Sequence, residues 1–298
     1  MNVYSSSFTD SLRHAVLIIG SIIVILPFYV MFSYSLKSPH EIETNSGGFL
    51  GKQEPMVDEY CVKLGNPIEE CTVIPVIYNY TEAFKKAPLV RYLLNGVFVT
   101  ASIFLIQALI ALPCAYALAK LRFWGRDFVF SLVTFCLLIP VHTIALPIYI
   151  MLAKVNLTNS YAALIIPWTI SVLGIFLMRQ FFKTVPDDLI DAARMDGMSE
   201  FAIVWRVMLP TAIPALLAFA IISVVAHWND YFWPRVVITG DRMLYTPPLG
   251  LREFKGDADG SIWGPMMATA TIIVTPLIVA FLLAQKRFVE GITMTGMK

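Results

Sequence analysis

Polar and ionisable residues inside long apolar stretches are the first candidates for chemistry, because a charge at the centre of a membrane helix costs about 2.5 to 3.5 kcal/mol on insertion scales. His142 and Thr143 lie between two prolines, whose missing N–H donors leave carbonyl groups for neighbours or water to satisfy. A second group closes a later apolar stretch: His227, Trp228, Asn229 and Tyr231. Other polar residues in such stretches are Asn95, Gln107 and Asp230.

Aromatic rings that stack on sugar faces, beside groups that bond hydroxyls, suit a neutral polyol. His142, Thr143 and the group at 227–231 therefore predict a substrate path. The alternative for each residue is a structural role, either in hydrogen bonds between helices or in an interfacial aromatic belt.

Patterns typical of a catalytic, metal or nucleotide site are missing from the sequence. The nearest match to a phosphate-binding Gly-x-x-x-x-Gly-Lys-Ser/Thr loop begins at Gly291 and continues with Met297. The histidines form no pair at metal-binding spacing, and no Gly-x-Ser-x-Gly turn occurs. We therefore expect no enzyme activity, no metal and no cofactor in this chain.

A polar segment at 184–210 separates two apolar stretches. Thr184 is expected to cap a short helix with Pro186 in its first turn, and Gly197 suits a left-handed stop. Acidic residues fall near the positive end of that helix: Asp187, Asp188 and Asp191. Ser199 then caps a second helix, which the closing proline is expected to end. Two short helices between membrane spans predict a docking element.

The first of these helices has residue types that fit packing against a partner. Ala192 and Ala193 are small enough to let another surface approach closely. Leu189, Ile190 and Met195 are expected to be apolar anchors for a groove in that partner. The alternative is an ordinary amphipathic helix that covers the chain's own bundle.

The composition requires a membrane environment for these segments. Of the 298 residues, 57% are hydrophobic and 14% charged, and the mean hydropathy is +0.70. Unpaired backbone groups are so unfavourable in lipid that only helices and closed barrels span it, and the apolar runs lack the alternation of barrel strands. The sequence thus predicts an all-α, polytopic membrane protein. A net charge of +1 gives no reason to expect nucleic-acid binding.

Six apolar stretches are long enough to be transmembrane helices. Their predicted ranges are 15–36, 92–119, 128–153, 161–182, 211–233 and 263–284. The first is too long and too thinly flanked by positive charge for a cleaved signal peptide, so we expect it to stay. Lys and Arg divide evenly between the two sides, but the dense basic link 120–126 favours cytoplasmic termini and a cytoplasmic 184–210 segment.

Residues 37–91 are polar and rich in glycine and proline, which predicts an external loop or small cap. Cys61 and Cys71 lie in it, and a disulfide between them is expected if that side is oxidising. Spacing alone does not supply the geometry of the bond, so two free thiols remain the alternative.

The spacing within 184–210 resembles a known motif. Asp191-Ala192-Ala193 is followed by Gly197 after three residues and by Val207-Met208-Leu209-Pro210 after nine more. This arrangement is similar to the EAA loop of bacterial ABC importer permeases, although Asp191 stands where the family usually has Glu. In that family the helix docks in a cleft of the cytoplasmic ATPase. The resemblance therefore implies coupling roles for Leu189, Asp191, Ala192, Ala193, Met195 and Gly197.

Residues 228–234 and 291–293 extend the resemblance to the carbohydrate-uptake branch, in particular to the second permease of maltose-type and glycerol-phosphate-type importers. It implies a type I ABC importer permease fold, import of a sugar, oligosaccharide or polyol by alternating access, and the bacterial inner membrane as location, with a periplasmic 37–91 loop. The implied partners are a second permease, two ATPase subunits that bind ATP and Mg, a periplasmic or lipid-anchored substrate-binding protein, and membrane lipid. The tail 288–298 resembles the segment that reaches between the ATPases; a disordered end is its alternative.

Two other functions stay open. A permease of another ABC branch would carry amino acids, peptides or anions, and strong cationic residues in the spans would favour anions. An ATP-independent secondary carrier would show internal hydropathy repeats and a buried ion site. Neither feature is visible in the sequence.

Overall fold

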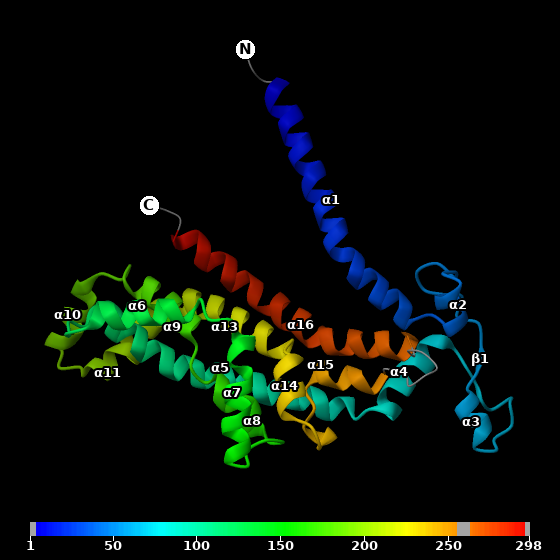
Figure 1. Ribbon diagram of the computed structural model, residues 1–298. Helices are drawn as coiled ribbons and strands as arrows, with labels where there is room; N and C mark the ends of the chain where they lie inside the picture. Colours follow the sequence, from blue (N-terminus) through cyan, green and yellow to red (C-terminus); the bar gives the residue numbers. More distant parts are fainter. Residues whose placement is uncertain (1–3, 255–262, 296–298) are drawn as a thin grey trace. The chain divides into compact units, whose positions relative to one another are not determined.

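The computed structural model describes residues 4–254 and 263–295, and its regular structure is almost entirely helical (Figure 1). The chain divides into two compact units. One comprises Met1–Leu89 and Leu251–Thr275, and the other comprises Val90–Gly250 and Pro276–Lys298. The prediction of an all-α protein is confirmed, with one two-stranded sheet in the described residues as the exception.

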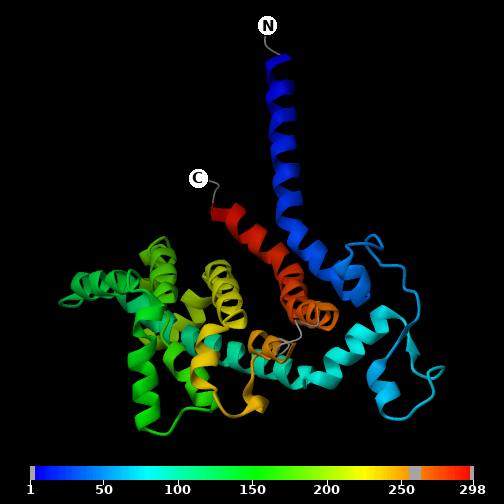
Figure 2. The same cartoon turned by 45° about the vertical axis from the view of Figure 1, so that its right-hand side comes forward.

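The first unit begins with the long helix α1 (Tyr4–Ser35). The elements that follow are α2 (Pro39–Glu43), β1 (Met56–Val57), α3 (Glu59–Lys63), β2 (Thr72–Val73) and α4 (Pro75–Lys86). The strands pair antiparallel, with Met56 opposite Val73. Figure 2 shows these elements as a small lobe beyond the C-terminal end of α1. Of the two forms expected for this segment, the structure therefore has the small cap and not a plain loop.

Buried hydrogen bonds hold the cap to the end of α1. Asn79 of α4 is completely buried and donates to the carbonyl oxygens of Ser35 and Lys37, at 3.0 and 2.9 Å. Its side chain also lies where a Cβ would stand on Gly264 of α16 (Trp263–Thr295), so the close approach of these helices requires glycine. Because every residue larger than glycine would collide with Asn79, this position is fixed by packing.

The second unit is built on helix α5 (Leu89–Lys120). Helix α9 (Val172–Phe182) contacts both α6 (Arg126–Cys136) and α13 (Ile213–Trp228). A Cβ on Gly174 of α9 would overlap the ring of Phe219 of α13, so glycine allows these two helices to meet closely. Phe219 packs there with buried side chains of α5 and α9: Ala111, Leu118 and Ile175.

Helices suited to a membrane occur at each predicted span. Among the described residues, four stretches are long and apolar enough to cross a bilayer: Asp10–Ser35, Leu89–Lys120, Tyr161–Phe182 and Trp263–Leu283. Two bent helix pairs raise the number to six if each pair is one span. These pairs are α6 with α7 (Val141–Lys154), and the stretch Glu200–Thr211 with α13.

Three of the predicted spans are not continuous helices. The 128–153 span bends by 97° before α7, where Pro140 lacks the N–H that a continuous helix needs. The 211–233 span ends early, because α13 stops at Trp228 and the separate helix α14 (Phe232–Val237) follows. The 161–182 span consists of α8 (Tyr161–Ile165), the 3-10 turn η1 (Ile166–Trp168) and α9.

Candidate functional site

Segment 184–210 contains the two predicted short helices. The first, α10 (Asp187–Met195), is followed by Gly197, whose φ of +80° lies in the left-handed region that glycine adopts without strain. The second, α11 (Glu200–Ile203), is capped by Ser199, whose hydroxyl accepts the N–H of Ala202 at 3.3 Å. The turn and the second cap therefore form as the sequence predicts.

Two details of this segment differ from the prediction. Thr184 does not cap α10, because its hydroxyl donates to the carbonyl of Phe181 at 2.8 Å and Pro186 occupies the cap position. Pro210 does not end the second helix. The π-helical turn η2 (Val204–Met208) leads into α12 (Leu209–Thr211), where proline stands in the first turn and its missing N–H would have no acceptor within that helix.

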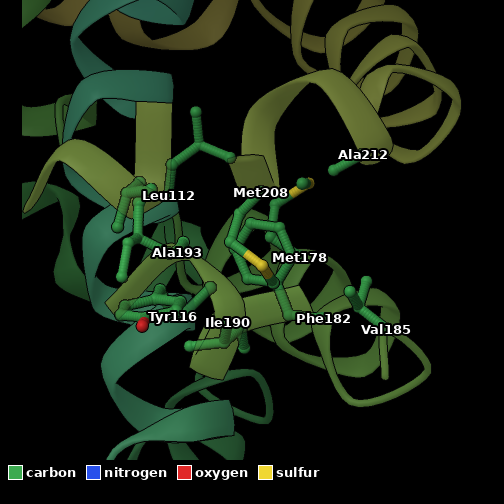
Figure 3. Packing of buried hydrophobic residues seen from close by; sticks show 12 residues of the cluster. Leu112, Tyr116, Met178, Phe182, Val185, Ile190, Ala193, Met208 and Ala212 are labelled. Atoms are coloured by element: carbon green, nitrogen blue, oxygen red, sulfur yellow. The ribbon is translucent and has the colours of Figure 1, made fainter. Parts of the chain in front are cut away.

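One face of α10 packs into the chain's own core. Ile190 is 2% exposed and Ala193 is 5% exposed. Figure 3 shows both beside Tyr116 of α5, in a cluster that also contains Leu112, Met178, Phe182, Val185, Met208 and Ala212. The expectation that Ile190 anchors a partner is therefore wrong, because its side chain is used inside this chain. The small size of Ala193 likewise serves packing within the chain.

The rest of the α10 surface is exposed and partly apolar. Leu189 is 48% exposed and Met195 is 84% exposed. Asp191, Ala192 and Gly197 are exposed as well. We name these five residues the coupling surface. Large apolar side chains that stay exposed next to polar ones are typical of a protein interaction site.

An ion pair attaches the start of α10 to the end of α5. The Lys120 ammonium lies 2.5 Å from Oδ1 of Asp187 and donates to the carbonyl of Val185 at 2.5 Å. This hydrogen bond from Lys120 holds the pKa of the Asp187 carboxyl below its ordinary value. Asp187 is therefore an anion at neutral pH, and the link persists there.

A second charged network joins α10, α11 and α5. Arg194 donates to Asp191 at 3.0 Å and to the two carboxylate oxygens of Glu200 at 2.8 and 3.3 Å. The hydroxyl of Tyr116 donates to Glu200 at 2.5 Å. The hydrogen bond from Arg194 lowers the pKa of Glu200, and the hydrogen bond from Tyr116 lowers it further. The hydrogen bonds that Arg194 makes to Glu200 and Asp191 raise the pKa of Arg194. Asp191 of the coupling surface thus belongs to a network that reaches α5.

A separate open cavity of about 570 Å³ lies among α5, α6, α7, η1, α9, α13 and α14. His142 and His227 line it, so the structure brings two predicted path residues together. Polar and aromatic side chains that share this lining are Gln107, Trp168, Ser171, Asp230, Phe232 and Trp233. Trp168 and Phe232 were not predicted as cavity residues, because no pattern in the sequence distinguishes them from aromatic side chains that face lipid.

Gln107 organises the polar side of this cavity. Its amide donates to the carbonyl of Trp168 at 2.7 Å and lies 3.2 Å from Nε2 of His227. Its carbonyl accepts the hydroxyl of Ser223 at 2.6 Å. The indole N–H of Trp168 is buried and has no acceptor among residues 4–254 and 263–295. The cavity therefore combines aromatic rings with a fixed amide and a spare donor.

The other predicted path residues do not line this cavity. Trp228 is buried, and the amide of Asn229 donates to the carbonyl of Val225 at 3.0 Å. Tyr231 accepts a hydrogen bond from Arg235 at 2.8 Å, and Thr143 is exposed on α7. For Asn229 these contacts fit the structural alternative. Asn95 is structural too, since it bonds the carbonyls of Met243 and Tyr245.

The remaining predicted features lie elsewhere. Cys61 and Cys71 form a disulfide in the cap, with Cα atoms 5.5 Å apart. Within the described part of the chain no group of three or more His, Cys, Asp or Glu side chains could hold a metal ion. The backbone of the tail is helical to Thr295, whereas its side chains from 286 onward and residues 296–298 lie outside the described part.

The chain is similar in sequence to permease proteins of known transport systems. Residues 107–294 match the family described as binding-protein-dependent transport system inner membrane component. The chain is 34% identical over 204 residues to the arabinooligosaccharides transport system permease protein AraQ of Halalkalibacterium halodurans, covering 68% of this chain and 72% of that protein. It is 30% identical over 288 residues to the sn-glycerol-3-phosphate transport system permease protein UgpE of Brucella abortus, covering 96% and 97%.

Solved structures share the fold. A chain from a bacterial ABC transporter involved in the import of the acidic polysaccharide alginate matches with a TM-score of 0.75 and 21% identity, over 97% of this chain and 99% of that one. A chain of the MetNI methionine ABC transporter matches with a TM-score of 0.52 and 18% identity, over 68% and 95%. The predicted type I ABC importer permease fold is confirmed. From its family match and its near-full-length relative, this chain belongs to the binding-protein-dependent transport system inner membrane components.

Proposed function

We propose that the chain is a membrane-spanning subunit of an ATP-driven importer of a sugar, oligosaccharide or polyol. The observation that carries the proposal is the division of α10 into a face packed in the chain's own core and an exposed coupling surface. A partner that binds Leu189, Ala192 and Met195 would displace the whole of α10. Ile190 and Ala193, on the buried face of the same helix, would then move as well. Since those two residues pack on α5 and α9, the displacement reaches the membrane helices.

The partner in this proposal is a cytoplasmic ATPase subunit with a groove for α10. Two such subunits bind ATP and Mg, while this chain contributes no nucleotide site. A second permease completes the path, and a periplasmic or lipid-anchored binding protein delivers the cargo. The complex lies in the bacterial inner membrane. The basic link 120–126, which Lys120 ties to α10, supports a cytoplasmic position for the coupling surface and for both termini.

In this proposal the cavity around Gln107 forms this chain's part of the substrate path. Its rings and its fixed amide fit a neutral, hydroxylated molecule. No Lys or Arg lines it within residues 4–254 and 263–295, which favours a neutral sugar or polyol over a phosphate ester. The relative named for arabinooligosaccharides supports the same choice, and the one named for sn-glycerol-3-phosphate defines the competing cargo.

The mechanism is alternating access. ATPase closure displaces the coupling surface, and the helices that meet at the cavity reorient so that it opens to one side and then to the other. The Lys120 and Arg194 networks make this displacement collective, because they join α10 and α11 to α5.

The test is reconstitution of the chain with its partner permease, ATPases and binding protein in liposomes. Uptake of labelled arabinooligosaccharide and of sn-glycerol-3-phosphate is measured with and without ATP. We expect ATP-dependent uptake with preference for the neutral sugar. Robust uptake by the isolated chain without nucleotide would contradict the importer role, and preference for the phosphate ester would contradict the choice of cargo alone.

A further inference from the structure

The turn between α5 and α6 combines exposed aromatic rings with positive charge. Residues 122–128 surround an open hollow of about 520 Å³. Trp124 is 100% exposed, Phe128 is 74% exposed and Phe123 is 44% exposed. Exposing large aromatic rings to water is unfavourable compared with burying them, so a group of exposed rings indicates a binding surface.

An apolar row on α6 continues this turn along the helix. Phe128, Leu132 and Phe135 follow one another at intervals of four and three residues, which places them on one helix face. They are 74%, 53% and 60% exposed. Since α6 is the first half of a helix pair apolar enough to span a membrane, this face is suited to contact with lipid tails. The turn lies at the start of that face, where a membrane border is expected.

Two arginines supply the charge at the border. Arg122 is exposed, and the side chain of Arg126 is partly exposed while its Nε donates to Asp127 at 3.2 Å. Lys120 does not contribute, because its side chain is 7% exposed and its ammonium bonds Asp187 and the Val185 carbonyl. Aromatic rings beside arginines at a bilayer border match the chemistry of an anionic lipid headgroup above acyl chains.

We infer that residues 122–128 form an interfacial anchor that binds an anionic phospholipid. Phe123 and Trp124 enter the acyl boundary, and Arg122 and Arg126 contact the phosphate. The rings lie at the end of a lipid-facing row, which favours lipid over a soluble ATPase as the occupant. Because Lys120 lies two residues before the anchor and holds the start of α10, the bound lipid fixes the coupling surface relative to the membrane.

Photo-crosslinking identifies the occupant directly. p-Benzoylphenylalanine replaces Trp124 in the complete transporter within native membranes, and mass spectrometry reads the adduct. We expect the adduct to have the mass of a phospholipid. An adduct with an ATPase or another polypeptide would overturn the inference. This variant keeps both arginines, so its result does not depend on the folding of the charge variants.

Anionic selectivity is tested in nanodiscs of phosphatidylcholine with phosphatidylglycerol. Retention of phosphatidylglycerol by the complex is measured by native mass spectrometry. Removing a positive charge near an anionic surface weakens binding about fivefold per charge, so we expect a large loss in R122Q/R126Q. The control K183Q removes an exposed charge elsewhere in the same unit and should retain lipid as the wild type does. Equal retention by R122Q/R126Q and wild type would overturn the inference.

Discussion

Lys120 at the end of α5 and Asp187 at the start of α10 form an ion pair with an N–O distance of 2.5 Å. The Lys120 side chain is 7% exposed, whereas that of Asp187 is 77% exposed. One partner is therefore fixed inside the helix bundle, and the other belongs to the segment that we expect to move with the ATPase. The same ammonium also bonds the Val185 carbonyl, which anchors the chain before the helix as well.

Replacing Lys120 with methionine should weaken coupling between ATP hydrolysis and transport. Met has a similar length but donates to neither Asp187 nor the Val185 carbonyl, so the first turn of α10 loses its tie to α5. We expect several-fold lower uptake with much of the ATPase activity retained, measured in proteoliposomes. K183M is the matched control and should transport normally. Unchanged uptake per ATP hydrolysed in K120M would show that the pair has no coupling role.

Acid should loosen the Arg194 network. Bonds from Arg194 and Tyr116 lower the pKa of Glu200, so its contribution to stability is present at neutral pH and is lost as pH falls below its ordinary pKa of about 4.3. Thermal unfolding of the detergent-solubilised protein, followed between neutral and acidic pH, measures this. E200Q should be less stable than wild type at neutral pH, and the difference should shrink toward acid. A constant difference would show that the ionised carboxylate is not what stabilises this network.

The two faces of α10 should respond differently to truncation. Ile190 is 2% exposed, so I190A should destabilise the protein by about 2 to 5 kcal/mol through the cavity that it leaves. Leu189 is 48% exposed, and L189A should change the stability by no more than about 0.5 kcal/mol while weakening association with the ATPase. Denaturation and co-purification measure the two effects. Strong destabilisation by L189A would mean that this face is not a free surface.

The turn after α10 should require a residue that accepts a positive φ. No atom lies within 4 Å of a Cβ built on Gly197, so G197A tests the backbone alone. At a φ of +80° we expect G197A to destabilise the segment by about 1 to 2 kcal/mol and to reduce transport. G197N should be milder, because asparagine tolerates this conformation. Hydrogen exchange of α10 and α11 reports the local change, and equal protection in all three proteins would contradict the prediction.

Gln107 should be required for transport more than for insertion. Q107L keeps the approximate size of the side chain but leaves the Ser223 hydroxyl, the Trp168 carbonyl and His227 without their partner. Each such loss costs about 1 to 3 kcal/mol when the group is buried. We expect the amount of Q107L protein in the membrane to match that of the wild type, while the rate of sugar uptake at saturating substrate falls. N95L is the comparison, since Asn95 bonds the carbonyls of Met243 and Tyr245 and the hydroxyl of Tyr161 outside the cavity lining, and its loss should mainly reduce stability.

The agreement between sequence and structure is closest where local rules decide the conformation. Gly197 adopts the predicted left-handed turn and Ser199 the predicted cap, because each depends on a few neighbouring backbone groups. The prediction failed at Thr184 and Pro210, where the neighbouring helix ends offered other bonds and a π-helical turn. The sharp bend before α7 was also not predicted from the sequence, because Pro140 permits a break in the helix without specifying its angle.

By itself, the sequence determined an all-helical membrane chain and the position of a polar docking segment, because hydropathy and helix capping depend on residues near one another in the chain. Only the tertiary structure decided which residues of that segment face outward. Ile190 and Ala193 stand three residues apart and share one helix face, but helices distant in sequence decide that this face is buried while Leu189 and Met195 stay exposed. The cavity was likewise decided by packing, since Gln107, Trp168 and His227 come from three different helical segments.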